Sequence, residues 1–294
     1  MISNRNFSIL LLIPASVGIS FGGLIMRNIN YADAWQIIFY KALSFIFLIT
    51  LILFNKYRFS IVSKIKIIGF SGMIGSFLLM LANLLIIQAY ANTSIANTSF
   101  TLSTTPFITA GLAYIFLKEK LSLRTILIMI VALFGIFIMI NDGLEKGDFY
   151  GNLMALGCAF CFSGFAIIVR KFRNIDMLPT LLISGVMIVV VSFVLSLENL
   201  TVPIHDVFLC FLWGGILSVF VSIIFIYSIR FLYASEVTFF MLLEISLSPF
   251  WVWIFLNETI SQETLFGGII VILSVIVYSF IELINSKLRT ISTD

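Results

Sequence analysis

Ten apolar stretches, each long enough to form one membrane-spanning helix, follow one another along almost the whole chain. They cover residues 7–27, 33–54, 66–89, 94–117, 122–141, 149–170, 177–197, 207–231, 235–256 and 263–285. A helix of about 20 apolar residues crosses the hydrocarbon core of a bilayer. The backbone has no water to bond there, so each stretch must form its own hydrogen bonds as a helix. The sequence therefore predicts an all-α membrane protein with ten transmembrane helices.

The composition excludes most other classes of protein. Of 294 residues, 61% are hydrophobic and 11% are charged, whereas roughly 25% of the residues of a soluble domain are charged. A water-soluble protein of this length has too little interior to bury so much apolar surface. Soluble enzymes, nucleic-acid binders and disordered proteins are thereby excluded. The net charge of +3 is too small to predict an anionic partner, and the expected surroundings are a lipid bilayer.

The basic residues predict the orientation of the helices. With the N-terminus inside and the helices alternating, 14 of the 17 Lys and Arg residues fall on the inner side, and the outer connections are acidic. Cytoplasmic loops of membrane proteins carry this excess of Lys and Arg. We therefore expect a multi-pass protein of the plasma (inner) membrane with both termini in the cytoplasm.

A short motif occurs twice, and it divides the chain into two halves. Phe116-Leu117-Lys118-Glu119-Lys120-Leu121-Ser122 matches Phe255-Leu256-Asn257-Glu258-Thr259-Ile260-Ser261 in its Phe, Leu, Glu and Ser. Each copy ends the fourth helix of a five-helix half, which gives predicted repeats of residues 1–145 and 146–294. Because five is odd, the second half enters the membrane in the opposite direction. Inverted repeats are typical of transporters, whose substrate site lies near the midplane between the halves.

Several segments together resemble one family. They are Phe39-Tyr40-Lys41, Ser103-Thr104-Thr105-Pro106-Phe107 with the motif that follows it, Ala234-Ser235-Glu236-Val237, and Leu243-Glu244-Ile245-Ser246-Leu247-Ser248-Pro249-Phe250-Trp251-Val252-Trp253. In these segments the chain is similar to the EamA-type members of the drug/metabolite transporter superfamily, with Lys41 where the family has Arg. The resemblance covers essentially the whole chain.

The resemblance implies a fold and a general activity. It implies ten helices in two inverted five-helix repeats around a central cavity, which helices 1–4 and 6–9 line. Helices 5 and 10 lie outside and can mediate a homodimer. Members of the family move small organic solutes across the membrane, often outward.

Three polar residues near the middle of the membrane are the first candidates for a substrate site. Glu244 lies about nine residues into helix 9, where a charge costs at least ~2.5–3.5 kcal/mol unless it faces protein or water. It can bind substrate or carry a proton, or form a structural hydrogen bond between helices. Thr105 occupies the matching position of the first half. Lys41 in helix 2 can bind an anionic group, pair with Glu244, or extend its long side chain to an interface.

Further candidates are less specific. Asn83 is a deep polar residue of helix 3, and Tyr40 and Trp213 can stack on a solute or simply contact lipid or the core. Proline removes a backbone hydrogen bond, so Pro14, Pro106 and Pro249 are expected to interrupt helices 1, 4 and 9. These interruptions suit either a moving gate or a static bend. The single histidine, His205, is expected in a solvated loop, and Cys158-x-x-Cys161 inside an apolar run predicts packing. Neither a metal site nor a cofactor is expected.

The function that these features favour is secondary transport by alternating access. The expected substrate is a small organic metabolite such as an amino acid or related zwitterion, moved by an exporter or exchanger. The sequence contains no G-x-x-x-x-G-K-[ST] nucleotide-binding motif, so a proton or solute gradient is the expected driving force. An enzyme is not expected. The alternatives are an intramembrane lipid-modifying enzyme and a non-transporting membrane subunit.

Overall fold

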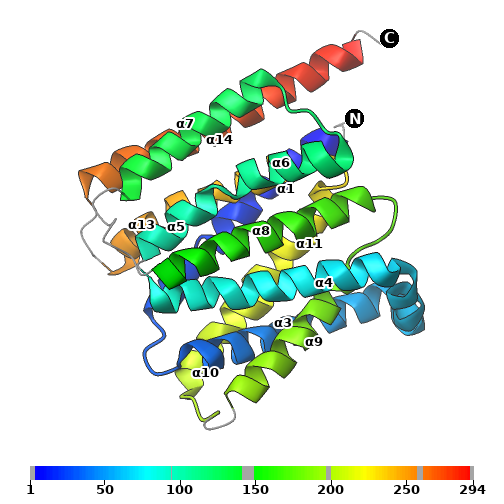
Figure 1. The fold of residues 1–294 in the computed structure, drawn as a ribbon, viewed down its shortest axis with the longest axis vertical. Helices are drawn as coiled ribbons and strands as arrows, with labels where there is room; N and C mark the ends of the chain where they lie inside the picture. The colour runs from blue at the N-terminus through cyan, green and yellow to red at the C-terminus, as the bar shows by residue number, and fades with distance from the viewer. Residues whose placement is uncertain (1–3, 94, 141–148, 197–199, 257–260, 292–294) are drawn as a thin grey trace.

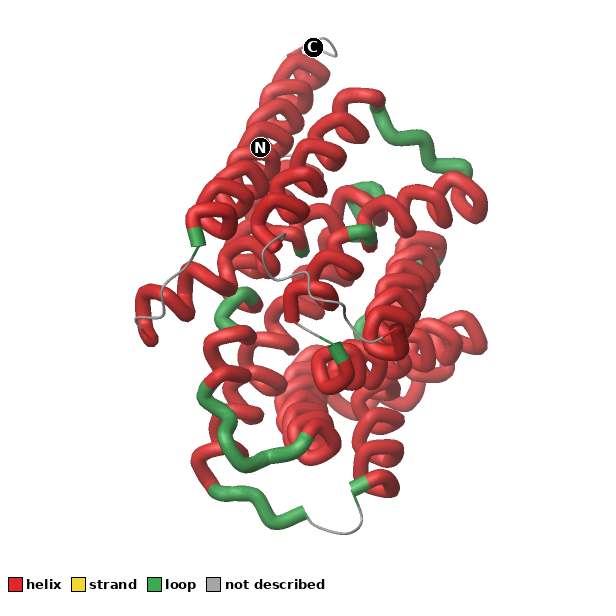
Figure 2. Tube along the Cα trace, turned by 60° about the vertical axis from the view of Figure 1, so that its left-hand side comes forward, coloured by secondary structure: helices red, strands yellow, loops and turns green. Residues whose placement is uncertain are grey.

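The computed structural model describes residues 4–93, 95–140, 149–196, 200–256 and 261–291, and these residues form helices joined by short connections (Figures 1 and 2). In chain order the helices are α1 (Asn4–Ile19), α2 (Gly22–Arg27), α3 (Ala34–Tyr57), the 3₁₀ turn η1 (Arg58–Ser60), α4 (Ile61–Asn92), α5 (Ile95–Ser103), α6 (Thr105–Leu117), α7 (Leu123–Ile140), α8 (Phe149–Lys171), α9 (Pro179–Leu195), α10 (Ile204–Cys210), the π-helix η3 (Phe211–Ser218), α11 (Val219–Ser228), α12 (Ala234–Phe240), α13 (Leu242–Leu256) and α14 (Gln262–Ile291).

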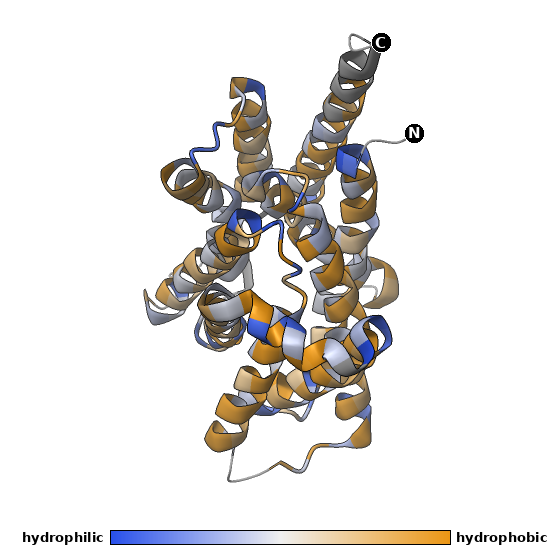
Figure 3. Cartoon of the chain, turned by 90° about the vertical axis from the view of Figure 1, so that its right-hand side faces the viewer, coloured by the Kyte–Doolittle hydropathy of each residue, from blue (hydrophilic) through white to orange (hydrophobic). Residues whose placement is uncertain are grey.

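The helices confirm the predicted fold class. Among the described residues, eight helical segments are long and apolar enough to cross a membrane, and two more apolar helices, Leu123–Ile138 and Pro179–Leu195, are shorter. Together they correspond to the ten predicted spans. Four spans consist of consecutive pieces, namely α1–α2, α5–α6, α10–η3–α11 and α12–α13. Hydrophobic residues dominate the helices, and hydrophilic residues lie mainly in connections and at helix ends (Figure 3).

The two ends of the bundle differ in the segments that they contain. The start of α1, the end of α14 and the connections 118–122 and 229–233 lie at one end, on the right in Figure 1. We call this the inner end, because its basic residues predict that it faces the cytoplasm. The connection 28–33 lies at the opposite, outer end. Both described ends of the chain are therefore on the same side of the bundle, as an even number of crossings requires.

The two halves pack against each other along their whole length. The main contacts between them are α4 on α8, α7 on α14, α3 on α9, α4 on α9, α3 on η3, α6 on α8 and α1 on α11. A buried core of Ile, Leu, Val and Phe side chains joins these helices, and Phe165 and Phe225 stack within it with ring centroids 6.0 Å apart. The boundary predicted between residues 145 and 146 falls outside the described residues.

The helices α7 and α14 form a separate pair at the edge of the bundle (Figure 1). They approach closely at Gly135, where a Cβ atom would lie 2.9 Å from the Gly267 carbonyl oxygen. Each begins with the same hydrogen bond, because Ser122 Oγ accepts from the Thr125 amide and Ser261 Oγ from the Thr264 amide, both at 3.1 Å. The duplicated motif therefore specifies the same helix start in each half. The homodimer expected through these helices stays a prediction.

Candidate functional site

The fourth helix of each half is interrupted at one residue, where the backbone keeps helical φ and ψ angles but changes to hydrogen bonds three residues apart. The first half breaks at Thr104, between α5 and α6, and the second at Met241, between α12 and α13. Glu244 lies in the first turn of α13, and its amide bonds the Met241 carbonyl at 3.1 Å. The unpaired N–H groups at a helix N-terminus stabilise a nearby negative charge. Glu244 therefore lies in the first turn of a helix, a position that favours a negative charge.

The breaks do not all fall where the prolines predict. Pro106 directly follows the break at Thr104, as expected. However, α1 continues through Pro14 and α13 through Pro249. The expectation that these two prolines interrupt their helices is wrong, because one lost backbone bond bends a helix without ending it. Helix 1 ends instead near Ser20, whose hydroxyl donates to the Val17 carbonyl at 2.6 Å. A gating role for the prolines stays a prediction.

Lys41 lies over an aromatic ring and close to Glu244. Its Nζ is 4.1 Å from the centroid of the Trp213 ring. Lys41 and Glu244 are near enough to interact electrostatically. Among the described residues, however, neither charged group has a hydrogen bond or an ion-pair partner. The predicted Lys41 therefore lies against Trp213 and within electrostatic range of Glu244.

Glycine residues determine where Lys41 and Trp213 lie. A Cβ atom on Gly214 would overlap the Lys41 carbonyl oxygen, so η3 contacts the backbone of α3 directly. A Cβ on Gly22 would be 2.7 Å from Trp213 Nε1. The π-helix itself brings the Ser218 hydroxyl back to the Trp213 carbonyl at 2.8 Å, and such π-helical turns are frequent at functional sites.

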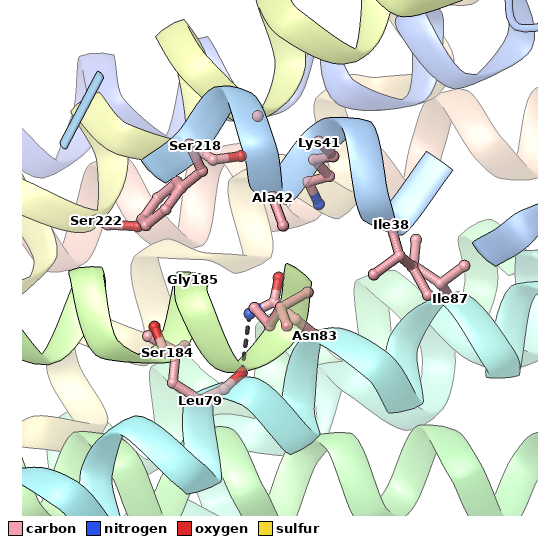
Figure 4. A pocket seen from close by; sticks show the side chains of 13 residues that line it. Ile38, Lys41, Ala42, Leu79, Asn83, Ile87, Ser184, Gly185, Ser218 and Ser222 are labelled. Atoms are coloured by element: carbon pink, nitrogen blue, oxygen red, sulfur yellow. Dashed lines mark hydrogen bonds between the residues drawn. The ribbon is translucent and has the colours of Figure 1, made fainter. Parts of the chain in front are cut away.

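Lys41 and Asn83 line the same cavity (Figure 4). This cavity has an empty volume of about 530 Å³ between α3, α4, α9 and the η3–α11 span. The Asn83 amide donates to the Leu79 carbonyl at 2.9 Å, which leaves its side-chain oxygen facing the cavity region. Pockets for small molecules are mostly apolar with a few polar groups that orient the ligand. The cavity has this character, with one cation, one amide and three serines among mostly apolar walls.

Three serines in this cavity were not among the predicted site residues. They are Ser184, Ser218 and Ser222. The hydroxyls of Ser184 and Ser218 are bonded to carbonyls of their own helices, whereas Ser222 has no partner among the described residues. Serine is common throughout this chain, so only the packing of α9, η3 and α11 around Lys41 distinguishes these three. Tyr90 and Cys158 are two further neighbours within electrostatic range of Glu244.

The side-chain hydroxyls of two predicted site residues, Thr105 and Tyr40, bond to backbone carbonyls of the protein. The Thr105 hydroxyl donates to the Leu102 carbonyl at 2.5 Å across the helix break. The Tyr40 hydroxyl donates to the Leu200 carbonyl at 2.7 Å, which ties α3 to a connection at the outer end. Both groups already have hydrogen-bond partners in the protein. Their roles in binding substrate stay predictions.

Charged residues at the inner end form ion pairs between the two halves. Arg5 pairs with Glu236 at 2.8 Å, Lys56 with Asp176 at 2.6 Å and Arg170 with Glu119 at 2.6 Å. In every pair one residue precedes position 145 and the other follows it. The Arg5 and Arg170 guanidinium groups also lie 5.9 and 5.7 Å from the Tyr233 ring. In this conformation, therefore, ionic contacts hold the halves together at the inner end.

Asp176 shows that these contacts are electrostatically favourable. Burial works to raise the pKa of its carboxyl, but hydrogen bonds from Lys56, Tyr57 and the Leu178 amide outweigh that effect and hold the pKa below its ordinary value. The negatively charged form of Asp176 is therefore stabilised by the contacts that close the inner end.

Comparison with protein families identifies the chain. The profile of the EamA-like transporter family matches it twice, over residues 6–141 and 149–280. The chain belongs to the EamA-like transporter family. The two matches account for the repeated architecture, and EamA-like proteins are membrane transporters of the drug/metabolite type.

The comparison with solved structures concerns the fold. A structure titled only "Crystal structure of protein" is similar to the chain with a TM-score of 0.78 at 12% sequence identity, covering 93% of this chain and 96% of the other. At this identity the likeness shows a shared fold and nothing about substrate. No curated protein matches the sequence.

Proposed function

We propose that this EamA-like protein is a secondary transporter of small zwitterionic metabolites such as amino acids, working as an exporter or exchanger in the plasma membrane with both termini in the cytoplasm. The observation that carries the proposal is the pair Lys41 and Glu244, which interact electrostatically without forming an ion pair. Buried charges are normally paired. A solute with a carboxylate for Lys41 and an ammonium group for Glu244 supplies both missing partners.

The contrast between the inner end and the cavity supports alternating access. The ion pairs at the inner end connect the two repeats, while the cavity that contains Lys41 lies farther along α3 toward the outer end. Opening the inner end requires these pairs to separate and their side chains to become hydrated. For Lys56 and Asp176, the most exposed of these pairs, that exchange is inexpensive, because an exposed ion pair contributes only about 0–1 kcal/mol. The broken helices α5–α6 and α12–α13 provide joints for the motion.

Glu244 is the proposed site for proton coupling. In one step it holds the ammonium group of the substrate, and in another it binds a proton, so the two ligands compete for one carboxylate. Export against a gradient then draws on the proton gradient. The protein's own residues carry out both steps, and neither needs a cofactor or a metal ion.

A reconstituted system tests this proposal. Proteoliposomes that contain the purified protein and an unlabelled amino acid should accumulate the same labelled amino acid by exchange. Glu244→Gln should reduce this exchange roughly hundredfold, because loss of one partner of a buried charged contact costs about 2–5 kcal/mol, and should remove its dependence on pH. Lys66→Gln, which changes an exposed lysine of the same protein, should leave exchange unchanged.

Two results would contradict the proposal. If Glu244→Gln leaves the rate, the affinity and the pH dependence of exchange at wild-type values, then Glu244 does not bind the substrate. If the wild-type protein exchanges none of the zwitterionic solutes but does exchange amines or carboxylates, the substrate class is wrong. Turnover of a labelled lipid without any solute exchange would support the enzyme alternative instead.

A further inference from the structure

A second pocket opens at the inner end, away from Lys41 and Glu244. It has an empty volume of about 460 Å³. The end of α3, the connection between α8 and α9, and the last turn of α11 surround it. Its lining belongs to both repeats, because Lys56 comes from the first half and the other lining residues from the second. The transport site described above uses none of these residues.

The walls of this pocket are apolar and its charged groups are mainly basic. Val169, Ile223 and Ile226 contribute aliphatic surface. Lys56, Arg173 and Arg230 are three cations, against the single carboxylate of Asp176. The pocket therefore has a formal excess of two positive charges next to a hydrophobic wall, which is the combination of surfaces that complements an amphiphilic anion.

The two arginines still have free hydrogen-bonding capacity. Arg230 Nε donates to the Arg173 carbonyl at 2.8 Å, which fixes its guanidinium group beside the α8–α9 connection. Within the described part of the chain, no hydrogen bond or ion pair involves the guanidinium of Arg173, and none involves the terminal nitrogens of Arg230. A guanidinium presents several N–H donors in a planar fork that matches the oxygens of a phosphate.

The ion pair between Lys56 and Asp176 forms part of the same lining. This pair links the repeats at the inner end. An anion seated beside Arg173 and Arg230 would lie next to Lys56 as well and would compete with Asp176 for its ammonium group. Occupation of the pocket is thereby connected to one of the contacts that close the inner end.

From these contacts we propose that the pocket binds a phosphate group through Arg173, Arg230 and Lys56. The phosphate comes from an anionic lipid headgroup or from a free phosphate compound. Basic pockets between transmembrane helices on the cytoplasmic side of a membrane bind anionic headgroups, and the aliphatic wall suits the glycerol and the first methylenes of such a lipid. Binding at this site does not depend on the identity of the transported solute.

Direct binding measurements on the full-length protein in neutral detergent test the proposal. One arm titrates short-chain phosphatidic acid and the other titrates glycerol phosphate, and native mass spectrometry counts the bound molecules. We expect one saturable molecule. Arg173→Gln should lower the affinity for this molecule roughly tenfold, as the loss of one charge-assisted hydrogen bond implies. The double variant with Arg173→Gln and Arg230→Gln should not bind it. Lys171→Gln is the matched control, because Lys171 is also exposed but does not line the pocket.

Each outcome has a defined meaning. Binding of phosphatidic acid alone supports a lipid headgroup, and binding of both ligands with similar affinity supports a free phosphate compound. If neither ligand binds, or if the arginine variants bind as tightly as the wild type and Lys171→Gln, the proposal is overturned. Because Arg173 has no side-chain partner in the described chain, its replacement tests binding without disturbing the fold.

Discussion

Oppositely charged residues occur in two regions of this protein, and they are arranged differently in each. At the inner end, Arg170 and Glu119 form an ion pair with nitrogen and oxygen 2.6 Å apart. In the middle of the bundle, Lys41 and Glu244 interact without reaching ion-pair distance. The charged residues at the inner end form ion pairs with each other, whereas Lys41 and Glu244 form none among the described residues. The difference supports the proposal that the first group holds the repeats together and the second binds a solute.

The largest expected effect concerns the ion pair at the inner end. The side chains of Arg170 and Glu119 are only 7% and 14% exposed, and Arg170 also donates to the carbonyls of Ile229 and Arg230. Arg170→Met should lower the free energy of unfolding by about 3–5 kcal/mol, because it leaves a buried carboxylate unpaired. Thermal unfolding in detergent measures this. Adding Glu119→Leu should restore most of the loss. Equal stability of Arg170→Met and Lys171→Met would show that this contact is not structural.

For Lys41 we expect a loss of transport without a loss of stability. Lys41→Gln should reduce solute exchange roughly hundredfold, since it removes the cation that binds the carboxylate. Its stability should equal or exceed that of the wild type, because a buried charge without an ionic partner is costly. Exchange assays and thermal unfolding on the same preparation measure both effects. If Lys41→Gln unfolds much more easily but exchanges solute normally, then Lys41 has a structural role and does not bind the substrate.

A smaller effect is expected from the contact that positions Lys41. Gly214→Ala should destabilise the protein by about 1–3 kcal/mol, because the new Cβ overlaps the Lys41 carbonyl and must push η3 from α3. Solute exchange should fall as Lys41 moves from Trp213. Gly111→Ala is the control, since a Cβ there meets nothing within 4 Å. If the two alanine variants behave alike, the approach of η3 to α3 does not determine the site.

The smallest expected effect is the dependence on pH of the stability that Asp176 contributes at the inner end. The pKa of Asp176 is lower in the folded protein than its ordinary value of 3.8, so its contribution to stability is complete above about pH 4 and is lost as the pH falls further. Asp176→Asn should cost about 1 kcal/mol or less at pH 7, since its partner Lys56 is half exposed. Melting temperatures of the variant and the wild type should converge as the pH falls below about 4. A constant difference across that range would contradict the assigned pKa.

Much of the fold could be predicted from the sequence, and the reasons are physical. Apolar length alone locates the spans, because the bilayer requires helices of a fixed length. The duplicated motif ending at Ser122 and Ser261 reappears as duplicated helix starts, and the second copy's Glu258 lies outside the described residues. The prediction that Pro14 and Pro249 interrupt their helices failed because local sequence does not show whether neighbouring helices support a bend or a break.

Less of the candidate site could be predicted. Lys41, Glu244 and Asn83 attract attention because polar side chains are costly in lipid, and the structure brings Lys41 close to Glu244 and places Asn83 in the same cavity. Ser222 and Tyr90 carry no such signal, because serine and tyrosine occur throughout the chain. Their positions depend on which helices meet around Lys41.

The sequence by itself determined the class of protein, the number of spans and the two inverted halves, because a chain in lipid must match the thickness and polarity of its solvent at every position. Only the tertiary structure decided which charges are paired. Whether two residues that are far apart in the sequence touch or remain separate depends on how helices pack, and close contacts such as that of Gly214 with the backbone of α3 fix that packing.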